Sequence, residues 1–386
     1  MQHIKKNILI FGHEASLTGA PILLLNLIGC LKDQHNFKIV LKRGGDLEAQ
    51  FSSIANTIIL KHKNYSVEKN FVKKVIDRLV YFFKQMSLVF LYMKADVIFS
   101  NTVCNGRLLN RFKIFQKPVF TYVHELESML QYFDQWNDTS YSLNLASKIF
   151  YPSKAVQYNL IKNHQVSINK TAYLPYYFPH QNFEFDFNDK LKHRKVFLHQ
   201  WSIPDDAFLV VGMGMVSVRK GTKHFIEVAQ QVISNSKKIY FIWIGDFSNE
   251  FFAQQIKNDF FENRELPNII FTGKLPYSTN NLLPFDLFFL SSVEDPYPLV
   301  VLEAAFQYVP TLCFEDSGGI TEFIEKDFGF NIANKSESET AKTIIEISQN
   351  AQHLKDLSLK VRNRMLFLHS NKEQTIEHFN IAIKNL

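Results

Sequence analysis

The amino-acid sequence predicts an α/β protein with two Rossmann-like domains. Three observations indicate this fold class. Strand and helix patterns alternate along the chain, the expected strands are apolar runs without polar alternation, and 386 residues exceed what one hydrophobic core usually supports. Apolar strands of this kind are typical of parallel sheets that are covered by helices on both faces.

The first half alternates strands and helices from its first residues. Strands are expected at 7–11, 37–41, 57–60, 97–100, 119–123, 146–151 and 171–174. Helices are expected at 20–31, 47–53, 67–93, 102–115 and 154–162. Residues 176–190 then lose periodicity and turn polar, so we place the linker between the domains there.

The second half repeats the pattern and ends in helices. Strands are expected at 208–214, 239–245, 269–272, 285–290 and 311–314. Helices are expected at 221–233, 250–263, 298–307, after the Gly318-Gly319 turn, and at 337–349, 352–367 and 372–384. The predicted domains are residues 1–180 and 195–370, followed by a terminal helix at 371–386.

The composition is that of an ordinary globular protein, with a mean hydropathy of -0.11. The 37 phenylalanines are the unusual feature, and they indicate core filling. Three cysteines without a C-x-x-C spacing argue against a disulfide framework and against a structural zinc site. The first apolar run is too short for a signal peptide, and no segment reaches the roughly 20 apolar residues that span a bilayer. We expect a cytoplasmic protein, either soluble or peripheral on the inner face of the membrane.

Positive charge is concentrated between Lys61 and Lys117, which holds twelve basic and three acidic residues in a chain of net charge +6. Such a region suggests an anionic partner. Within it, residues 71–93 form an apolar helical pattern with interspersed lysines. Two interpretations stay open: a helix packed on the sheet with solvated lysines, or an interfacial helix on an anionic membrane surface. Nucleic acid is the weaker alternative, because no recognition motif accompanies the charge.

The most informative stretch runs from Phe288 to Ile324 and completes the strand expected at 285–290. It predicts a buried strand, a Pro-punctuated loop that carries Asp295, an apolar helix that carries Glu303, a short strand and a Gly-Gly turn. A helix N-terminus at the carboxyl end of a parallel strand forms an anion site, because free N–H groups and the helix dipole converge there. Phosphate is the expected ligand. On its own, each of the two carboxylates could equally be a solvated surface group.

The sequence of this stretch, E-D-P-Y-P-L-V-V-L-E-A followed by G-G-x-x-E, resembles retaining GT-B glycosyltransferases of family 4, the glycosyl transferases group 1. The resemblance implies two Rossmann-like domains that face each other across a cleft, with the terminal helix crossing back to the first domain. It also implies that Glu303 binds the nucleotide ribose and that Asp295 faces the donor sugar. The helix start at Leu299 and Val300 would bind the donor diphosphate.

Arg219 and Lys220 stand just before the helix expected at 221–233. Two cations at a helix N-terminus oppose the helix dipole, and this mismatch favours an anion nearby. The family resemblance implies that both residues bind the leaving diphosphate, where fixed positive charge stabilises the transition state. The commoner family pattern has an arginine where this chain has Met215. The resemblance therefore supports phosphate binding by Lys220 more strongly than by Arg219.

Further site residues come from the same resemblance. Gly19, in the loop 12–21, would let the backbone approach the donor diphosphate. His124, at the end of a strand, would contact the donor sugar and close the site. His13 and Asn101 would lie at the acceptor, although His13 could equally be a loop-surface residue. Leu275 would pack beside the nucleotide base, which is a weak signal.

No D-x-D sequence occurs, so no carrier of metal-dependent diphosphate binding is visible, and we expect neither a metal nor another cofactor. Gly212 and Gly214 form only half of a dinucleotide fingerprint. The interpretation is a retaining transferase that moves a hexose from a UDP- or GDP-sugar to a hydroxyl of a glycan or lipid-linked acceptor, in cell-surface polysaccharide or glycolipid synthesis. The alternatives are a nucleotide-sugar 2-epimerase of the same fold and a degenerate, non-catalytic partner subunit.

Overall fold

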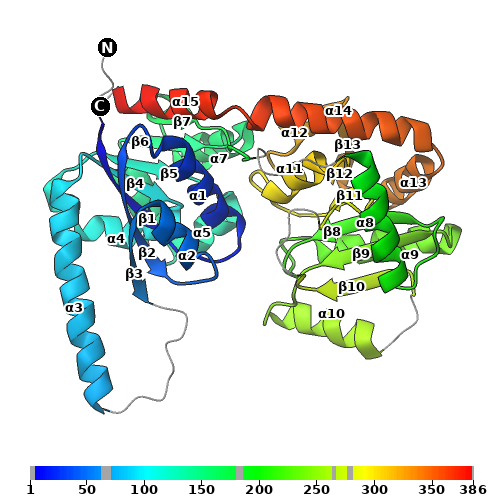
Figure 1. Ribbon diagram of the computed structural model, residues 1–386, viewed down its shortest axis with the longest axis horizontal. Helices are drawn as coiled ribbons and strands as arrows, with labels where there is room; N and C mark the ends of the chain where they lie inside the picture. Colours follow the sequence, from blue (N-terminus) through cyan, green and yellow to red (C-terminus); the bar gives the residue numbers. More distant parts are fainter. Residues whose placement is uncertain (1–4, 62–70, 180–185, 263–266, 276–280, 385–386) are drawn as a thin grey trace. The chain divides into compact units, whose positions relative to one another are not determined.

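The computed structural model describes residues 5–61, 71–179, 186–262, 267–275 and 281–384. The chain divides into two compact units (Figure 1). Unit 1 comprises Met1–Pro179 together with Asn371–Leu386, and unit 2 comprises His180–Ser370. The last helix of the chain therefore belongs to the unit in which the chain begins.

Unit 1 is built on a seven-stranded sheet of order β3-β2-β1-β4-β5-β6-β7 with parallel pairing throughout. The strands are β1 (Asn7–Gly12), β2 (Asn36–Arg43), β3 (Asn56–Lys61), β4 (Val97–Asn101), β5 (Val119–Tyr122), β6 (Lys148–Tyr151) and β7 (Thr171–Tyr173). All residues of β4 and β5 are buried, because helices cover both faces of the sheet. The predicted parallel sheet is confirmed.

The helices of unit 1 follow the strands in alternation. They are α1 (Gly19–Leu31), α2 (Glu48–Ile54), α3 (Phe71–Lys94), α4 (Gly106–Arg111), α5 (Glu127–Asp134), α6 (Asp138–Leu145), α7 (Lys154–His164) and α15 (Lys372–Lys384). The helix expected at 102–115 is wrong as a single element. Thr102 has φ = 87°, and two 3-10 turns, Val103–Asn105 and Lys113–Phe115, flank the short α4. Helices α5 and α6 were not anticipated.

Helix α15 completes the aromatic core of unit 1. The ring of Phe379 stacks on Phe150 with centroids 5.8 Å apart and lies near Phe99 and Phe120. The buried Nε2 of His35 and Oδ1 of Asn380 are 2.9 Å apart. A helix from the end of the chain thus fills space beside strands that form its beginning.

Unit 2 is built on a six-stranded parallel sheet of order β10-β9-β8-β11-β12-β13. Its strands are β8 (Phe208–Met213), β9 (Ile239–Ile244), β10 (Ile269–Gly273), β11 (Leu287–Leu290), β12 (Thr311–Phe314) and β13 (Gly329–Ile332). Its helices are α8 (Phe187–Gln200), α9 (Thr222–Asn235), α10 (Phe251–Glu262), α11 (Leu299–Phe306), α12 (Thr321–Ile324), α13 (Glu337–Ser348) and α14 (Ala351–His369). Strand β13 was not anticipated.

Aromatic residues fill the core of unit 2, as the phenylalanine content predicts. Phe225 of α9 stacks on Phe289 and lies edge-on to Phe241 and Trp243 at centroid distances of 5.1–5.9 Å. The linker expected at 176–190 is wrong at its end. Asp186 caps α8 and forms a reciprocal capping box with Asp189, so the polar residues start a helix there. Residues 180–185 of that linker lie outside the described residues.

The strand order of each sheet reverses at one point, between β1 and β4 in unit 1 and between β8 and β11 in unit 2. In doubly wound sheets, ligands bind outside the carboxyl ends of the strands at this point. The segments that follow these four strands contain most of the predicted site residues. The sheet topology therefore directs attention to one candidate site in each unit.

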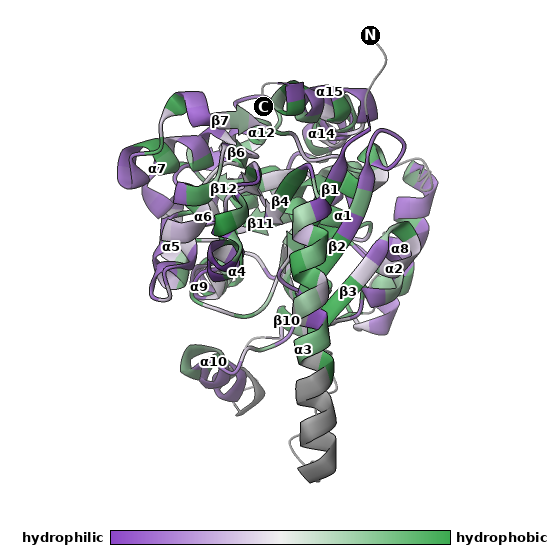
Figure 2. Cartoon of the chain, turned by 90° about the vertical axis from the view of Figure 1, so that its left-hand side faces the viewer, coloured by the Kyte–Doolittle hydropathy of each residue, from purple (hydrophilic) through white to green (hydrophobic). Residues whose placement is uncertain are grey.

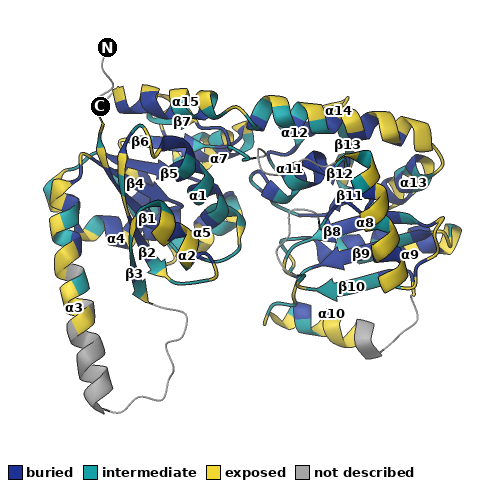
Figure 3. Ribbon diagram, in the orientation of Figure 1, coloured by how far each residue is buried: buried dark blue, intermediate teal, exposed yellow. Residues whose placement is uncertain are grey.

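Helix α3 exposes much of its described surface (Figure 3), and apolar residues recur along its described part (Figure 2). It buries Leu88 and Tyr92 in the core of unit 1. Five described apolar side chains between 53% and 67% exposed point to solvent: Phe82, Phe83, Met86, Phe90 and Met93. Among the described helices, none combines the length and the apolar character that crossing a membrane requires.

Candidate functional site

In unit 2, the loops after β8 and β11 are locked together at Gly221. This residue has φ = +65°, and a Cβ added there would lie 1.7 Å from the backbone oxygen of Ser291. The Ser291 hydroxyl donates to the Lys220 carbonyl oxygen at 3.1 Å, and the Val293 N–H donates to the Arg219 carbonyl oxygen at 3.0 Å. Only glycine permits this close approach, which brings the segment with the two cations against the loop with Asp295.

Lys220 and Asp295 form an ion pair at this junction. The Nζ of Lys220 lies 2.6 Å from Oδ2 of Asp295, and their side chains are only 17% and 8% exposed. Asp295 is held in turn by the Gly-Gly turn, because its N–H donates to the Ser317 carbonyl oxygen at 2.6 Å and it bridges to Gly318. The pair thus fixes a cation and a carboxylate at the switch point of the sheet.

Arg219 lies beside this pair. Its guanidinium donates to the Glu294 carbonyl oxygen at 3.2 Å. The chain then enters α11 through Pro298, whose side chain cannot cap the helix. Leu299 is buried and Val300 is half-buried at the start of this helix. Cations and a helix N-terminus without a side-chain cap converge here, which is an arrangement suited to a phosphate group.

Glu303 lies on α11, one turn after Leu299. Its side chain is half-buried, and burial raises the pKa of its carboxyl group to about 7. Among the described residues, no side-chain or backbone donor forms a recorded hydrogen bond to this carboxyl group. A desolvated carboxyl group without a donor is unfavourable unless a ligand satisfies it. Glu303 is therefore suited to accept hydrogen bonds from ligand hydroxyls.

Leu275 follows strand β10, at the far edge of the same sheet, and is half-buried. Residues 276–280 of its loop lie outside the described residues. Leu275 and the pair of Lys220 and Asp295 follow strands of the same sheet, and this sheet is the structural link between them.

In unit 1, His124 is held from both sides of its ring. Its Nδ1 lies 2.9 Å from the Tyr176 hydroxyl, and its Nε2 lies 2.9 Å from Oδ1 of Asn101. The Asn101 amide nitrogen donates to the Ala20 carbonyl oxygen at 3.1 Å, so Oδ1 is left to accept the proton of His124 Nε2. Burial, and then the nearby His13, lower the pKa of His124 to about 3. The ring is therefore neutral, with its proton on Nε2.

His13 lies near His124 at the end of β1. Its Nε2 is 3.7 Å from Oε1 of Glu14, and burial lowers its pKa. The buried Nδ1 of His13 has no hydrogen-bond partner in the described part of the chain. Gly19, at the start of α1, has no described atom within 4 Å of the position that a Cβ would take, so packing does not demand a glycine there.

Two residues of this constellation were not anticipated from sequence. Glu125 is 7% exposed, its carboxylate accepts the His124 N–H at 2.8 Å, and burial raises its pKa to about 7. Its position directly after His124 was an available signal. Tyr176 carried none, because it falls in the polar segment that we interpreted as linker. Asn101 contacts His124 through its amide oxygen and the α1 backbone through its amide nitrogen. The sequence predicted an acceptor contact for Asn101 but not this positioning role.

The structure thus brings together Arg219, Lys220 and Asp295 in unit 2, and His13, Asn101 and His124 in unit 1. Known proteins resemble this chain in sequence and in fold. Residues 194–364 match the family described as Glycosyl transferases group 1. The matched segment lies within unit 2 and contains Arg219, Lys220, Asp295 and Glu303.

A similar curated protein is the alpha-galactosylglucosyldiacylglycerol synthase of Streptococcus pneumoniae. It is 32% identical over 165 residues, which cover 42% of this chain and 42% of that protein. The match thus spans less than half of the length of this relative.

Solved structures resemble the whole chain at low identity. Anabaena Alr3699/HepE, solved in complex with UDP and glucose, has a TM-score of 0.79 at 16% sequence identity. The alignment covers 99% of this chain and 100% of that chain. Sucrose-phosphate synthase from Thermosynechococcus elongatus has a TM-score of 0.75 at 15% identity, with coverages of 98% and 99%. These likenesses show the fold, which is GT-B with two Rossmann-like domains.

Proposed function

We propose that this chain is a retaining glycosyltransferase that moves a hexose from a nucleotide diphosphate sugar to a hydroxyl of a glycan or lipid-linked acceptor. The carrying observation is the junction at Gly221, where the half-buried Lys220 pairs with the buried Asp295 beside Arg219 and the start of α11. This junction lies at the switch point of the sheet, within the segment that matches Glycosyl transferases group 1. UDP is the first candidate for the donor nucleotide, because a similar structure contains UDP and glucose; GDP is the second.

In this proposal, different residues of unit 2 bind different parts of the donor. Lys220 and Arg219 neutralise the diphosphate, with Lys220 exchanging part of its contact with Asp295 for a phosphate oxygen. Leu299 and Val300 offer backbone N–H groups to the same diphosphate. Glu303 accepts hydrogen bonds from the ribose hydroxyls, and Leu275 lies beside the base.

The sugar and acceptor roles involve Asp295 and the residues of unit 1. Asp295 binds hydroxyls of the sugar, His124 contacts the sugar, and Gly19 leaves space for the diphosphate. His13, with its unpartnered Nδ1, is the acceptor-side candidate. Asn101 acts through His124. In the reaction, the bond from the anomeric carbon to the phosphate oxygen breaks, the acceptor oxygen bonds to that carbon on the same face, and its proton passes to the departing phosphate. This sequence requires neither a side-chain base nor a metal.

The first test measures nucleotide binding without metal. Melting temperatures are recorded with UDP, GDP, ADP and CMP, since a ligand that binds only the folded state raises them by mass action. We expect a rise with UDP or GDP that is lost in Lys220→Ala and Glu303→Ala. Lys238→Ala is the matched control, because Lys238 forms an exposed ion pair with Asp206 in the same unit. No rise with any nucleotide would argue for a non-catalytic subunit.

A second test addresses the reaction. Incubation with the bound nucleotide's sugar and lipid or glycan acceptors should give a product whose anomeric configuration, read by NMR, equals that of the donor. An inverted product would contradict retention, and conversion of the donor to its 2-epimer without acceptor would indicate the epimerase instead.

The acceptor surface of this proposal is an anionic membrane on the cytoplasmic side, met by α3. Support comes from the exposed apolar side chains of this helix and from the basic content of the surrounding segment, together with the glycolipid product named for the pneumococcal relative. Co-sedimentation with vesicles containing 30% phosphatidylglycerol should exceed that with phosphatidylcholine alone. Phe83→Asp should abolish the difference, whereas Phe367→Asp, at a still more exposed residue in unit 2, should not. Equal binding of both vesicle types would count against it.

A further inference from the structure

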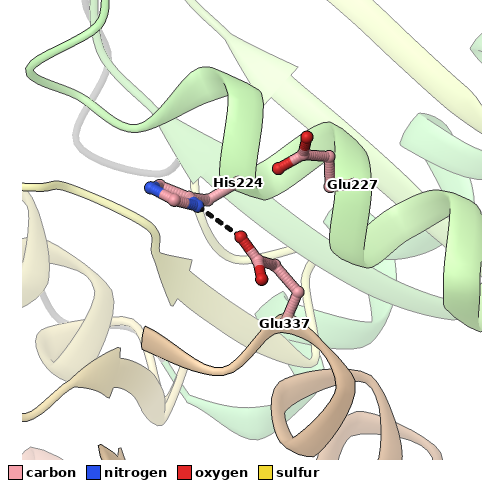
Figure 4. A group of neighbouring side chains, drawn as sticks. All are labelled: His224, Glu227 and Glu337. Carbon is pink, nitrogen blue, oxygen red and sulfur yellow. Dashed lines mark hydrogen bonds and ion pairs between the residues drawn. The ribbon is translucent and has the colours of Figure 1, made fainter. Parts of the chain in front are cut away.

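A cluster of three potential metal ligands lies on unit 2, outside the loops just described. It consists of His224 and Glu227 on α9 and Glu337, the first residue of α13 (Figure 4). One ligand atom from each residue lies within 4.8 Å of the others. His224 and Glu227 are three residues apart and therefore project from the same face of α9. Figure 4 shows both carboxylates lying beside the imidazole.

The cluster places two carboxylates beside one imidazole. Nδ1 of His224 lies 2.7 Å from Oε1 of Glu337, and this hydrogen bond is the main reason that the pKa of Glu337 is lowered. Glu227 adds a second carboxylate beside the same imidazole. Its recorded ion pair is with Lys223 at 3.7 Å, a lysine that is 70% exposed and contributes little. Two carboxylates therefore share one imidazole.

The three ligands lie on two helices, α9 and α13. The edge of the His224 ring packs against Phe314, with centroids 5.6 Å apart. Ser336 caps α13 by accepting the Glu339 N–H, which orients the first turn that carries Glu337. The cluster borders an open hollow that Gln230, Gln231 and Ser234 also line, so water has access to complete a coordination shell.

We propose that His224, Glu227 and Glu337 bind one divalent transition-metal ion, Zn²⁺ or Co²⁺, which joins α9 to α13. One imidazole nitrogen with two carboxylate oxygens suits these ions, whereas Mg²⁺ and Ca²⁺ prefer oxygen ligands alone. The ion replaces the hydrogen bond between Nδ1 and Glu337, so protonation of the imidazole competes with binding and affinity falls as the pH is lowered. Helix α9 begins directly after Gly221, so the ion would also steady the helix that follows Lys220.

This proposal is independent of the donor and acceptor, and its test uses metal binding alone. The full-length protein is stripped with a chelator and titrated with CoCl₂ and ZnCl₂, with cobalt followed by its visible absorption and bound zinc counted after dialysis. We expect one equivalent of either ion, displacement of cobalt by zinc, and no displacement by an equal concentration of MgCl₂.

Three variants separate a metal site from an ordinary ion pair. His224→Asn and Glu337→Gln should each weaken binding roughly ten-fold or more, as loss of one of three ligands implies. Glu227→Gln leaves the hydrogen bond between His224 and Glu337 intact and should weaken binding equally. His164→Asn is the matched control, because His164 pairs with Glu127 in unit 1 at 3.0 Å and is not part of the cluster.

Absence of a tight equivalent, or binding that Glu227→Gln leaves unchanged, would reduce the cluster to a His–Glu ion pair and overturn the proposal. An equal loss in His164→Asn would overturn it as well, because it would show binding to histidines in general. Melting temperatures of the metal-free variants, compared with the metal-free parent, show that each variant is folded before binding is interpreted.

Discussion

Glu303 has a half-buried carboxyl group whose pKa burial raises to about 7 from an ordinary value of 4.5. The charged form is therefore disfavoured in the folded protein, so this group favours folding most below about pH 4.5, and that advantage is lost as the pH rises through 7. By contrast, each charged group at the Gly221 junction has a partner within the protein: Lys220 pairs with Asp295, and Arg219 donates to a carbonyl oxygen. A desolvated carboxyl group without a donor, as at Glu303, is typical of a ligand-binding group.

Glu303→Gln should stabilise the protein at pH 8 and leave it nearly unchanged at pH 4.5. The difference in pKa sets an upper limit of about 3 kcal/mol for the gain at pH 8. Urea unfolding of both proteins at the two pH values measures it, with Glu346→Gln on the exposed side of α13 as control. A gain that is the same at both pH values would mean that Glu303 is not neutralised by burial.

His124 should remain neutral from pH 5 to pH 8, because both ring nitrogens are engaged and burial lowers its pKa to about 3. Asn101→Asp would place a carboxylate against Nε2 and should raise the pKa of His124 by more than two units. Histidine ¹⁵N chemical shifts report the tautomer and the titration directly. His164, which pairs with Glu127 near the surface, is the internal reference. A parent His124 that titrates near 6.5 would contradict the tautomer inferred here.

At the scale of elements, the junction of the loops after β8 and β11 depends on one glycine. Its positive φ and its contact with Ser291 both exclude a side chain. The sequence R-K-G displays this glycine, yet the partner that demands it lies seventy positions away in the printed sequence. The predicted elements around the site, β8, α9, β11 and α11, are confirmed, because their apolar patterns are strong and local.

Gly221→Ala should destabilise unit 2 by more than about 3 kcal/mol, since the added Cβ forces the backbone of Ser291 to move and adds strain at a positive φ. Gly29→Ala is the matched control. Gly29 lies inside α1, and outside the backbone of that helix no described atom comes within 4 Å of its Cβ position, so alanine there should stabilise unit 1 by about 0.5–1 kcal/mol. Urea denaturation compares the two, and a neutral Gly221→Ala would show that the close approach does not exist in solution.

At the scale of the whole molecule, unit 1 is assembled from two separated pieces of the chain. Helix α15 enters the aromatic cluster of Phe99, Phe120 and Phe150 through Phe379. The stability of unit 1 therefore depends on helix α15, whereas unit 2 contains its own core within one continuous piece of the chain.

Phe379→Ala should lower the stability of unit 1 by about 3–5 kcal/mol, the usual cost of truncating a buried phenylalanine. Calorimetry resolves the effect if the units unfold separately, since the transition of unit 1 should move down and that of unit 2 should not. Phe367→Ala, on an 80% exposed residue of α14, is the control. A shift in both transitions would show that the two units unfold together.

Much of this protein could be predicted from its sequence, and for identifiable reasons. Parallel strands buried on both faces read as apolar runs, so the two sheets and most of their helices are visible in local patterns. The residues Lys220, Asp295 and Glu303 stand in a recognisable motif. Which residues contact one another was decided by the tertiary structure alone. It places Gly221 against Ser291 and pairs Lys220 with Asp295. It also places Tyr176 and Asn101 within hydrogen-bonding distance of His124, and pairs His224 with Glu337. These contacts join residues far apart in the chain, and only the folded sheets bring them within bonding distance.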